Sequence, residues 1–142
     1  MEWIYDTGGR EKYYKALNVS DCVTRAIAIA NGMDYKETYM ALKKYNGGES
    51  PRNGVCEFIY KKMLIDLGWE HVDLKAERTS LADADLPNDE IIICRLSGHL
   101  VAVVNGVIHD TWNSGKGRKH RPPKELLGYW VKLDEKSTAP DL

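Results

Sequence analysis

Residues 97–112 read SGHLVAVVNGVIHDTW, and this stretch decides the fold of the second half of the chain. The Asn-Gly pair at 105–106 lies between two runs of β-branched residues, a pattern typical of a hairpin with a two-residue type I′ turn. Such a turn fixes the register of its strands, so we expect Val104 to lie opposite Val107. The hairpin therefore predicts which side chains share a face.

A histidine and an aspartate meet in this register. Strand alternation places His99, Asp110 and Trp112 on one face. The same face is expected to carry three apolar residues, Val101, Val103 and Ile108. His99 and Asp110 become diagonal neighbours with Cα atoms about 7–8 Å apart, which two side chains can bridge by a hydrogen bond. A carboxylate beside an imidazole is the orienting half of a nucleophilic triad, and Trp112 is expected to shield the pair from water.

A cysteine at the start of a helix would complete such a triad. Helix-forming residues follow Cys22 as far as Gly32, and both Ser20 and Asp21 are suitable N-cap residues. The positive end of the helix dipole and a neighbouring imidazolium both favour the thiolate, so we predict Cys22 as the nucleophile. The alternative is that Cys22 is a small core residue, as free cysteines often are.

The rest of the chain predicts helices before the hairpin and strands around it. We expect helices from 34 to 46 and from 55 to 67, and strands over 69–74, 90–96 and 128–133. Because helices come first, we expect an α+β domain whose N-terminal helices pack on a C-terminal antiparallel β-sheet. The length predicts one domain over 1–142, with residues 1–12 as an N-terminal extension and 135–142 as a flexible tail.

Composition limits the classes of function. Twenty Lys and Arg against 21 Asp and Glu give a net charge of −1, so no global field recruits nucleic acid or a membrane. Three cysteines without paired spacing, and the lack of a signal sequence, predict a reduced cytoplasmic protein. We expect Cys56 and Cys94 to be packing residues, and His109 to be structural. No CxxC, HExxH or phosphate-loop motif occurs, so we expect no metal and no cofactor.

One segment, residues 116–124, concentrates positive charge. Its candidate substrate-rim residues are Lys116, Arg118, Lys119 and Arg121. Because the segment begins four residues after Trp112, we expect it near the rim of the cleft, where it could hold an acidic or phosphate-bearing partner. The alternative is a solvated loop. Aromatic residues do not interleave with these charges, so we do not expect nucleic acid to bind.

The order of Cys22, His99 and Asp110 along the chain resembles that of the papain-like cysteine peptidase superfamily. The segment Asp110-Thr111-Trp112 also resembles the Asn-Ser-Trp segment of papain relatives, in which an indole covers the histidine. The resemblance is to a small bacterial or phage-type member. It implies a papain-like fold and a peptidase-type or amidase-type hydrolase, or an acyltransferase, that forms a thioester with a protein or peptide substrate.

The motif around the cysteine departs from the papain pattern. Residues 20–23, Ser-Asp-Cys-Val, stand in its place, and no Gln precedes the cysteine at the usual distance. We therefore take Asn18 as the candidate oxyanion donor, together with the Cys22 backbone N–H. Two other functions stay open: a catalytically idle papain-like fold that binds a partner protein as a host-directed phage-type effector, and a metal site at Cys22, His99 and Asp110.

Overall fold

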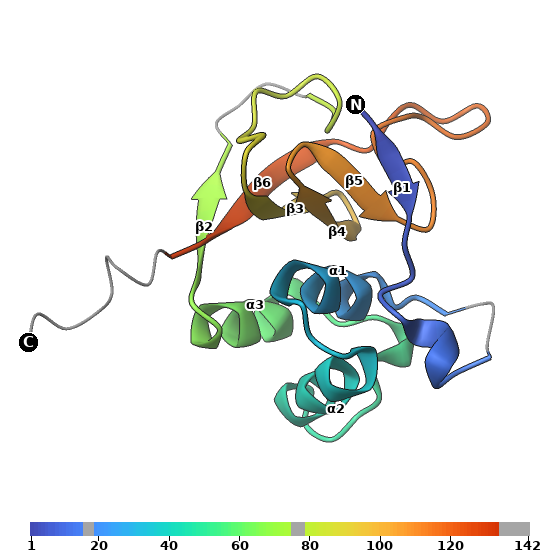
Figure 1. Ribbon diagram of the computed structural model, residues 1–142, viewed down its shortest axis with the longest axis vertical. Coiled ribbons are helices and arrows are strands. Elements are labelled where there is room, and N and C mark those ends of the chain that lie inside the picture. The colour runs from blue at the N-terminus through green and yellow to red at the C-terminus, as the bar shows by residue number, and fades with distance from the viewer. Residues whose placement is uncertain (16–18, 75–78, 134–142) are drawn as a thin grey trace, which may run out of the picture.

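The computed structural model describes residues 1–15, 19–74 and 79–133, and it shows a layer of helices packed on a six-stranded sheet (Figure 1). Helices precede most strands in the chain, so the α+β class is the expected one. The predicted tail at 135–142 lies outside the described residues.

Three α-helices form the lower layer of Figure 1. They are α1 (Cys22–Asn31), α2 (Tyr35–Tyr45) and α3 (Glu57–Asp66), with short 3-10 helices η1 (Arg10–Lys12) and η2 (Pro51–Asn53). Gly32 ends α1 with a φ of 62°, and the Asp34 carboxylate caps α2 by accepting the Glu37 N–H. Both boundaries follow from the local sequence. None of the helices in the described ranges has the length and apolarity needed to cross a membrane.

The sheet is mixed rather than purely antiparallel. Its strands are β1 (Trp3–Tyr5), β2 (Trp69–Asp73), β3 (Ile91–Leu96), β4 (His99–Val104), β5 (Val107–Asp110) and β6 (Leu126–Lys132), in the order β1-β5-β4-β3-β6-β2. β1 pairs in parallel with β5, whereas the other pairs are antiparallel. The expected antiparallel sheet is therefore wrong at this edge, where the expected N-terminal extension supplies a strand. Three residues are too few for a strand pattern to be visible in the sequence.

The hairpin between β4 and β5 has the predicted register. Val104 pairs with Val107 and Val103 with Ile108 across the turn. Asn105 and Gly106 both adopt positive φ, at 49° and 80°, as a type I′ turn requires. The local sequence was sufficient to predict this pairing because a two-residue loop allows no slippage.

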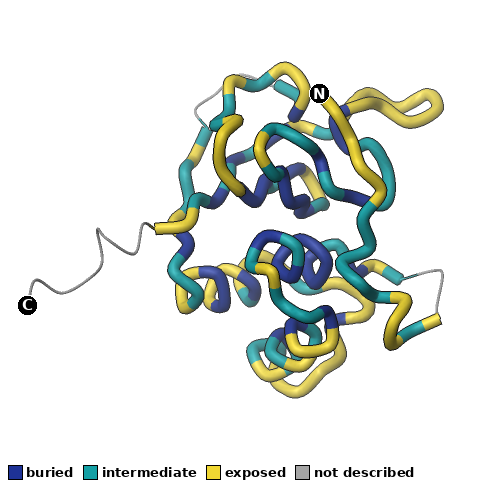
Figure 2. The backbone as a smooth tube through the Cα atoms, viewed as in Figure 1, coloured by how far each residue is buried: buried dark blue, intermediate teal, exposed yellow. Residues whose placement is uncertain are grey.

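Both faces of the sheet are buried. Leu100 and Ala102 pack with Ile27 of α1 on the helical side, and Figure 2 shows buried backbone in α1 and in the central strands. The alternate hairpin residues Val101, Val103 and Ile108 pack in a second cluster with Leu81, which is fully buried. The apolar residues that we expected to share a face with His99 therefore lie away from α1. The sequence does not distinguish the two faces of the hairpin, because both carry apolar residues.

Candidate functional site

The predicted nucleophile begins α1. Cys22 is its first residue and is half-buried. Asp21 occupies the N-cap position, but its side chain makes no capping hydrogen bond. The first N–H groups of a helix have no partner within the helix, so they point toward the space in front of Cys22. This position favours negative charge on the thiol and on any oxyanion formed beside it.

His99 connects this thiol to Asp110. The His99 imidazole and the Cys22 thiol line the same cavity, and His99 Nε2 lies 2.6 Å from Asp110 Oδ2. Because Nε2 is occupied by the carboxylate, Nδ1 is the ring nitrogen that can exchange a proton with the thiol. The Trp112 ring lies beside the imidazole, with 5.2 Å between the ring centroids. The structure thus brings together the three predicted triad residues and the predicted shield.

Burial and charge act in opposite directions on these groups. Burial alone would raise the pKa of Cys22, but the interaction with His99 and the nearby positive charges bring that pKa below the ordinary thiol value. Burial also opposes the charged form of His99, yet the interactions with Asp110 and Cys22 prevail and raise the pKa of His99 to about 9. Both shifts act in favour of a thiolate–imidazolium pair.

A buried charge network that the sequence did not reveal lies behind Asp110. Arg25 Nη2 is 3.1 Å from Asp110 Oδ1, and the same guanidinium is paired with Asp21. Asp21 is 1% exposed and also accepts hydrogen bonds from Tyr35, at 2.7 Å, and from Arg10, at 3.0 Å. The signal in the sequence was the i, i+4 spacing of Asp21 and Arg25, but that spacing normally indicates a solvated pair.

The N-terminal strand holds the backbone of Asp110. The Asp110 carbonyl accepts hydrogen bonds from the Trp3 indole Nε1 and from the Asp6 backbone N–H, each at 3.0 Å. On the side chain, Oδ1 also accepts the Thr111 backbone N–H at 2.7 Å. Asp110 is therefore fixed through its main chain by β1 and through its side chain by three donors.

A cavity of about 310 Å³ opens beside the thiol and the imidazole. Its apolar walls include Val55, Tyr60, Leu100 and Leu127, and the turn glycines Gly54 and Gly98 also line it. Glu57 and Arg95 add an ion pair of 2.7 Å to its lining. Cys56 lines the cavity too and is exposed, so the expectation that it packs in the core is wrong, whereas Cys94 is fully buried. The cavity thus offers space next to Cys22 that is lined largely by apolar residues.

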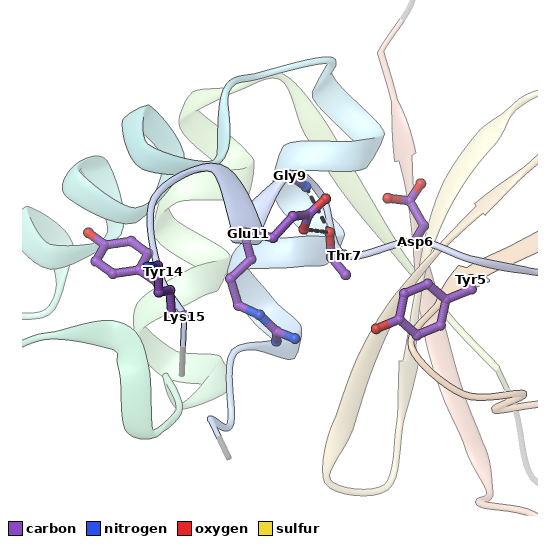
Figure 3. Close-up of a pocket in the computed structure, with 8 residues that line it drawn as sticks. Tyr5, Asp6, Thr7, Gly9, Glu11, Tyr14 and Lys15 are labelled. Atoms are coloured by element: carbon purple, nitrogen blue, oxygen red, sulfur yellow. Dashed lines mark hydrogen bonds between the residues drawn. The ribbon is translucent and has the colours of Figure 1, made fainter. Parts of the chain in front are cut away.

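A larger hollow of about 660 Å³ lies elsewhere, within residues 5–15. Figure 3 shows Tyr5 and Asp6 on one side of it and Tyr14 and Lys15 on the other. It is lined by neither a cysteine nor a histidine. The larger hollow therefore contains none of the predicted site residues.

The predicted rim residues lie beyond Trp112. The Arg118 guanidinium stacks on the Trp112 ring at 4.1 Å from its centroid. Lys116, Arg118 and Arg121 line a further cavity of about 300 Å³ with Trp112, whereas Lys119 is exposed and does not line it. The structure thus places three of the four predicted rim residues around one hollow next to the shield.

Three other expectations meet different outcomes. Asn18, the candidate oxyanion donor, lies outside the described residues. Within the described ranges, no group of three or more His, Cys, Asp and Glu side chains is arranged to hold a metal ion, so the alternative metal site gains no support. His109 makes a structural pair with Asp6, at 2.9 Å.

No model of a known protein family, no curated protein and no solved structure matches this chain.

Proposed function

We propose that this protein is a papain-like thiol hydrolase of the peptidase or amidase type, with Cys22 as nucleophile, His99 as acid and base, and Asp110 as the group that orients His99. The observation that carries the proposal is the hydrogen bond of 2.6 Å between His99 Nε2 and Asp110 Oδ2, formed where His99 and Cys22 line the same cavity. An isolated core cysteine would not need such a partner.

The arrangement of elements supports the papain-like assignment. The cysteine begins a helix that packs on the sheet, and the histidine and the acid lie on the adjacent antiparallel strands β4 and β5. His99 and Asp110 lie at the ends of their strands, where they interact with residues of the first turn of α1. Residues in the middle of the same strand face, such as Val101, pack instead in the cluster that contains Leu81. A nucleophile, a base and an orienting carboxylate thus come from three elements held by one core.

The proposed reaction has two steps. The Cys22 thiolate attacks a substrate carbonyl and forms the C–S bond, and the His99 imidazolium gives its Nδ1 proton to the departing amine as the C–N bond breaks. The product is a thioester. Neutral His99 then takes a proton from water while the water oxygen attacks the thioester carbonyl; the C–S bond breaks, and the acid product, the thiolate and the imidazolium result. If an amine replaces the water, the same steps give acyl transfer.

Thiol alkylation tests the first requirement of this mechanism. We expect iodoacetamide to alkylate Cys22 at pH 6 about tenfold faster than Cys56, the exposed thiol of the same cavity, because only Cys22 has an imidazolium partner. Mass spectrometry of the digested protein gives both rates from one sample. His99→Ala should remove the advantage of Cys22, whereas Cys56→Ser should leave it unchanged.

Acylation tests the second requirement. We expect p-nitrophenyl acetate to release nitrophenol in a burst equal to the protein concentration and to leave an acetyl group on Cys22. The proposed hydrolase would be contradicted if Cys22 were alkylated no faster than Cys56 and no burst were seen. That result would favour the alternative of a catalytically idle fold that binds a partner protein.

A further inference from the structure

The cavity beyond Trp112 is strongly cationic. Most of its lining residues belong to the segment 116–125 between β5 and β6, which projects at the upper right of Figure 1 and is largely exposed in Figure 2. Four cationic side chains line it, Lys116, Arg118, Arg121 and Lys124, together with the single carboxylate of Glu125. With a volume of about 300 Å³, it is large enough to receive a few carboxylate groups.

The positive charges of this cavity have few partners within the protein. In the ranges that the structure describes, no ion pair involves Lys116, Arg118 or Arg121. Lys124 donates a hydrogen bond of 3.0 Å to the Ser97 carbonyl, which fixes its ammonium at the cavity without neutralising it. Cations held together without counter-charges repel one another, so an anion that enters the cavity relieves the repulsion.

The backbone holds the two arginines in place. Arg118 and Arg121 form a bridge across a tight turn, with the Arg121 N–H donating to the Arg118 carbonyl at 2.9 Å. Gly117 packs so closely that a Cβ there would lie 2.3 Å from the Arg121 carbonyl oxygen. The turn therefore fixes the backbone positions of both arginines, and stacking on Trp112 holds the Arg118 guanidinium as well.

The cationic cavity lies close to the proposed reactive centre. Trp112 contacts both the His99 imidazole and the Arg118 guanidinium, so one ring connects the imidazole to the cation. Ser97 lines the cationic cavity, and its neighbour Gly98 lines the cavity beside Cys22. A chain that crosses the turn at 97–98 would place one part in the apolar cavity, the reacting bond at the thiol and the next part among the cations.

We propose that the cavity of Lys116, Arg118, Arg121 and Lys124 binds acidic side chains of a peptide substrate, next to the bond that the proposed thiol hydrolase cleaves. This inference rests on the proposed function, because the bound peptide is a substrate only if the protein is the proposed hydrolase. Acidic peptide fits better than nucleic acid, because Trp112 is the single aromatic residue lining the cavity and Arg118 already stacks on it. Base stacking would need an aromatic platform that is free.

The test compares two blocked tetrapeptides, acetyl-(Glu)4-amide and acetyl-(Gln)4-amide, by calorimetry at low salt. We expect the glutamate peptide to bind about tenfold more tightly, and the advantage to disappear in high salt because exposed charges are screened. Arg118→Gln/Arg121→Gln should lose the advantage. The matched control is Lys43→Gln/Lys44→Gln, which removes the same charge from the last turn of α2 and should retain it.

A second measurement links the cavity to the thiol. The glutamate peptide should slow the alkylation of Cys22 by iodoacetamide in the wild type and not in the double arginine variant. Equal binding of the two peptides, or unchanged binding in that variant, would overturn the inference, as would tighter binding of octathymidylate. Binding without protection of Cys22 would overturn the substrate assignment. An unreactive Cys22 would defeat the proposed enzyme, and calorimetry would still report on the cavity.

Discussion

Asp110 shows how much a single residue can be constrained. Its carboxylate lies between the His99 imidazole and the Arg25 guanidinium and also accepts a backbone N–H from Thr111. Burial would raise the pKa of Asp110, but the hydrogen bond from His99 and the charges of His99 and Arg25 lower it. The carboxylate is thus held charged in a site that is 2% exposed, where it fixes the plane of the imidazole.

Replacing Asp110 separates orientation from charge. Asp110→Asn should retain part of the alkylation rate of Cys22, because an amide oxygen can still accept from His99 Nε2. Asp110→Ala should lose more of this rate and destabilise the fold by about 3–5 kcal/mol, since the buried Arg25 loses a partner. The rate is measured with iodoacetamide between pH 5 and 9, and the stability by urea unfolding. Equal rates in Asp110→Ala and the wild type would remove Asp110 from the site.

Trp112 should matter more to chemistry than to folding. We expect Trp112→Phe to fold, because the substitution keeps most of the packing, and yet to alkylate more slowly at Cys22 with an altered pH profile. The reason is that the indole excludes water from the His99–Asp110 hydrogen bond, and a smaller ring excludes less. Circular dichroism checks the fold. A folded variant with the wild-type rate and pH profile would show that the indole has no part in the site.

At the scale of elements, Arg25 connects α1 to the end of β5. Its guanidinium bridges Asp21, at the start of its own helix, and Asp110, on the strand. The helix that carries the proposed nucleophile is thereby tied to the strand that carries the proposed orienting acid. This connection, rather than helix capping, is what Asp21 provides, since its carboxylate makes no cap hydrogen bond.

Breaking this connection should disturb stability and geometry together. Arg25→Met should lower the free energy of unfolding by about 3–5 kcal/mol, because two buried carboxylates lose a cation. Arg25→Lys keeps the charge but should restore only part of the stability, since one ammonium lacks the fork that reaches both acids. Arg52→Met, at an exposed position, is the matched control and should change stability little. The measurement is urea unfolding, with Cys22 alkylation as a second readout.

The same elements show how far sequence reasoning reaches. His99 and Asp110 could be paired in advance because a two-residue turn sets their register locally. Arg25 and Trp3 could not be assigned, because their contacts with Asp110 join residues 85 and 107 positions apart and depend on how helix and strand pack. The sequence also did not show which face of the hairpin packs on the helices, because both faces carry apolar residues. Local geometry was predictable, whereas the partners supplied by packing were not.

For the whole molecule, the site makes stability depend on pH. The pKa of His99 is raised from its ordinary value of 6.5 to about 9 in the folded protein, so protonated His99 stabilises the fold below pH 6.5, and this contribution is lost as pH rises through about 9. Asp110 acts in the opposite direction. Its lowered pKa adds stability above its ordinary value of 3.8, and this is lost in stronger acid.

Because the lowered pKa of Cys22 works against the effect of His99 at high pH, the test uses Cys22→Ala. Its free energy of unfolding in urea should fall as pH rises above 6.5. The double variant Cys22→Ala/His99→Gln lacks the titrating group and should not show this part of the fall. If the two variants have parallel profiles from pH 6 to 9.5, the His99–Asp110 pair does not couple to folding.

The pairing of β1 with β5 also sets an order of events during synthesis. Trp3 leaves the ribosome 107 positions before its partner Asp110, and Arg25 leaves it 85 positions before Asp110. Cys22 likewise precedes His99 by 77 positions. Contacts this distant in sequence close late in folding. Until β4 and β5 have emerged, the nascent chain therefore carries Cys22 as an ordinary thiol. The reactivity that we propose for Cys22 is withheld until then, which spares the chain, and the proteins around the ribosome, from a nucleophile without a finished cleft.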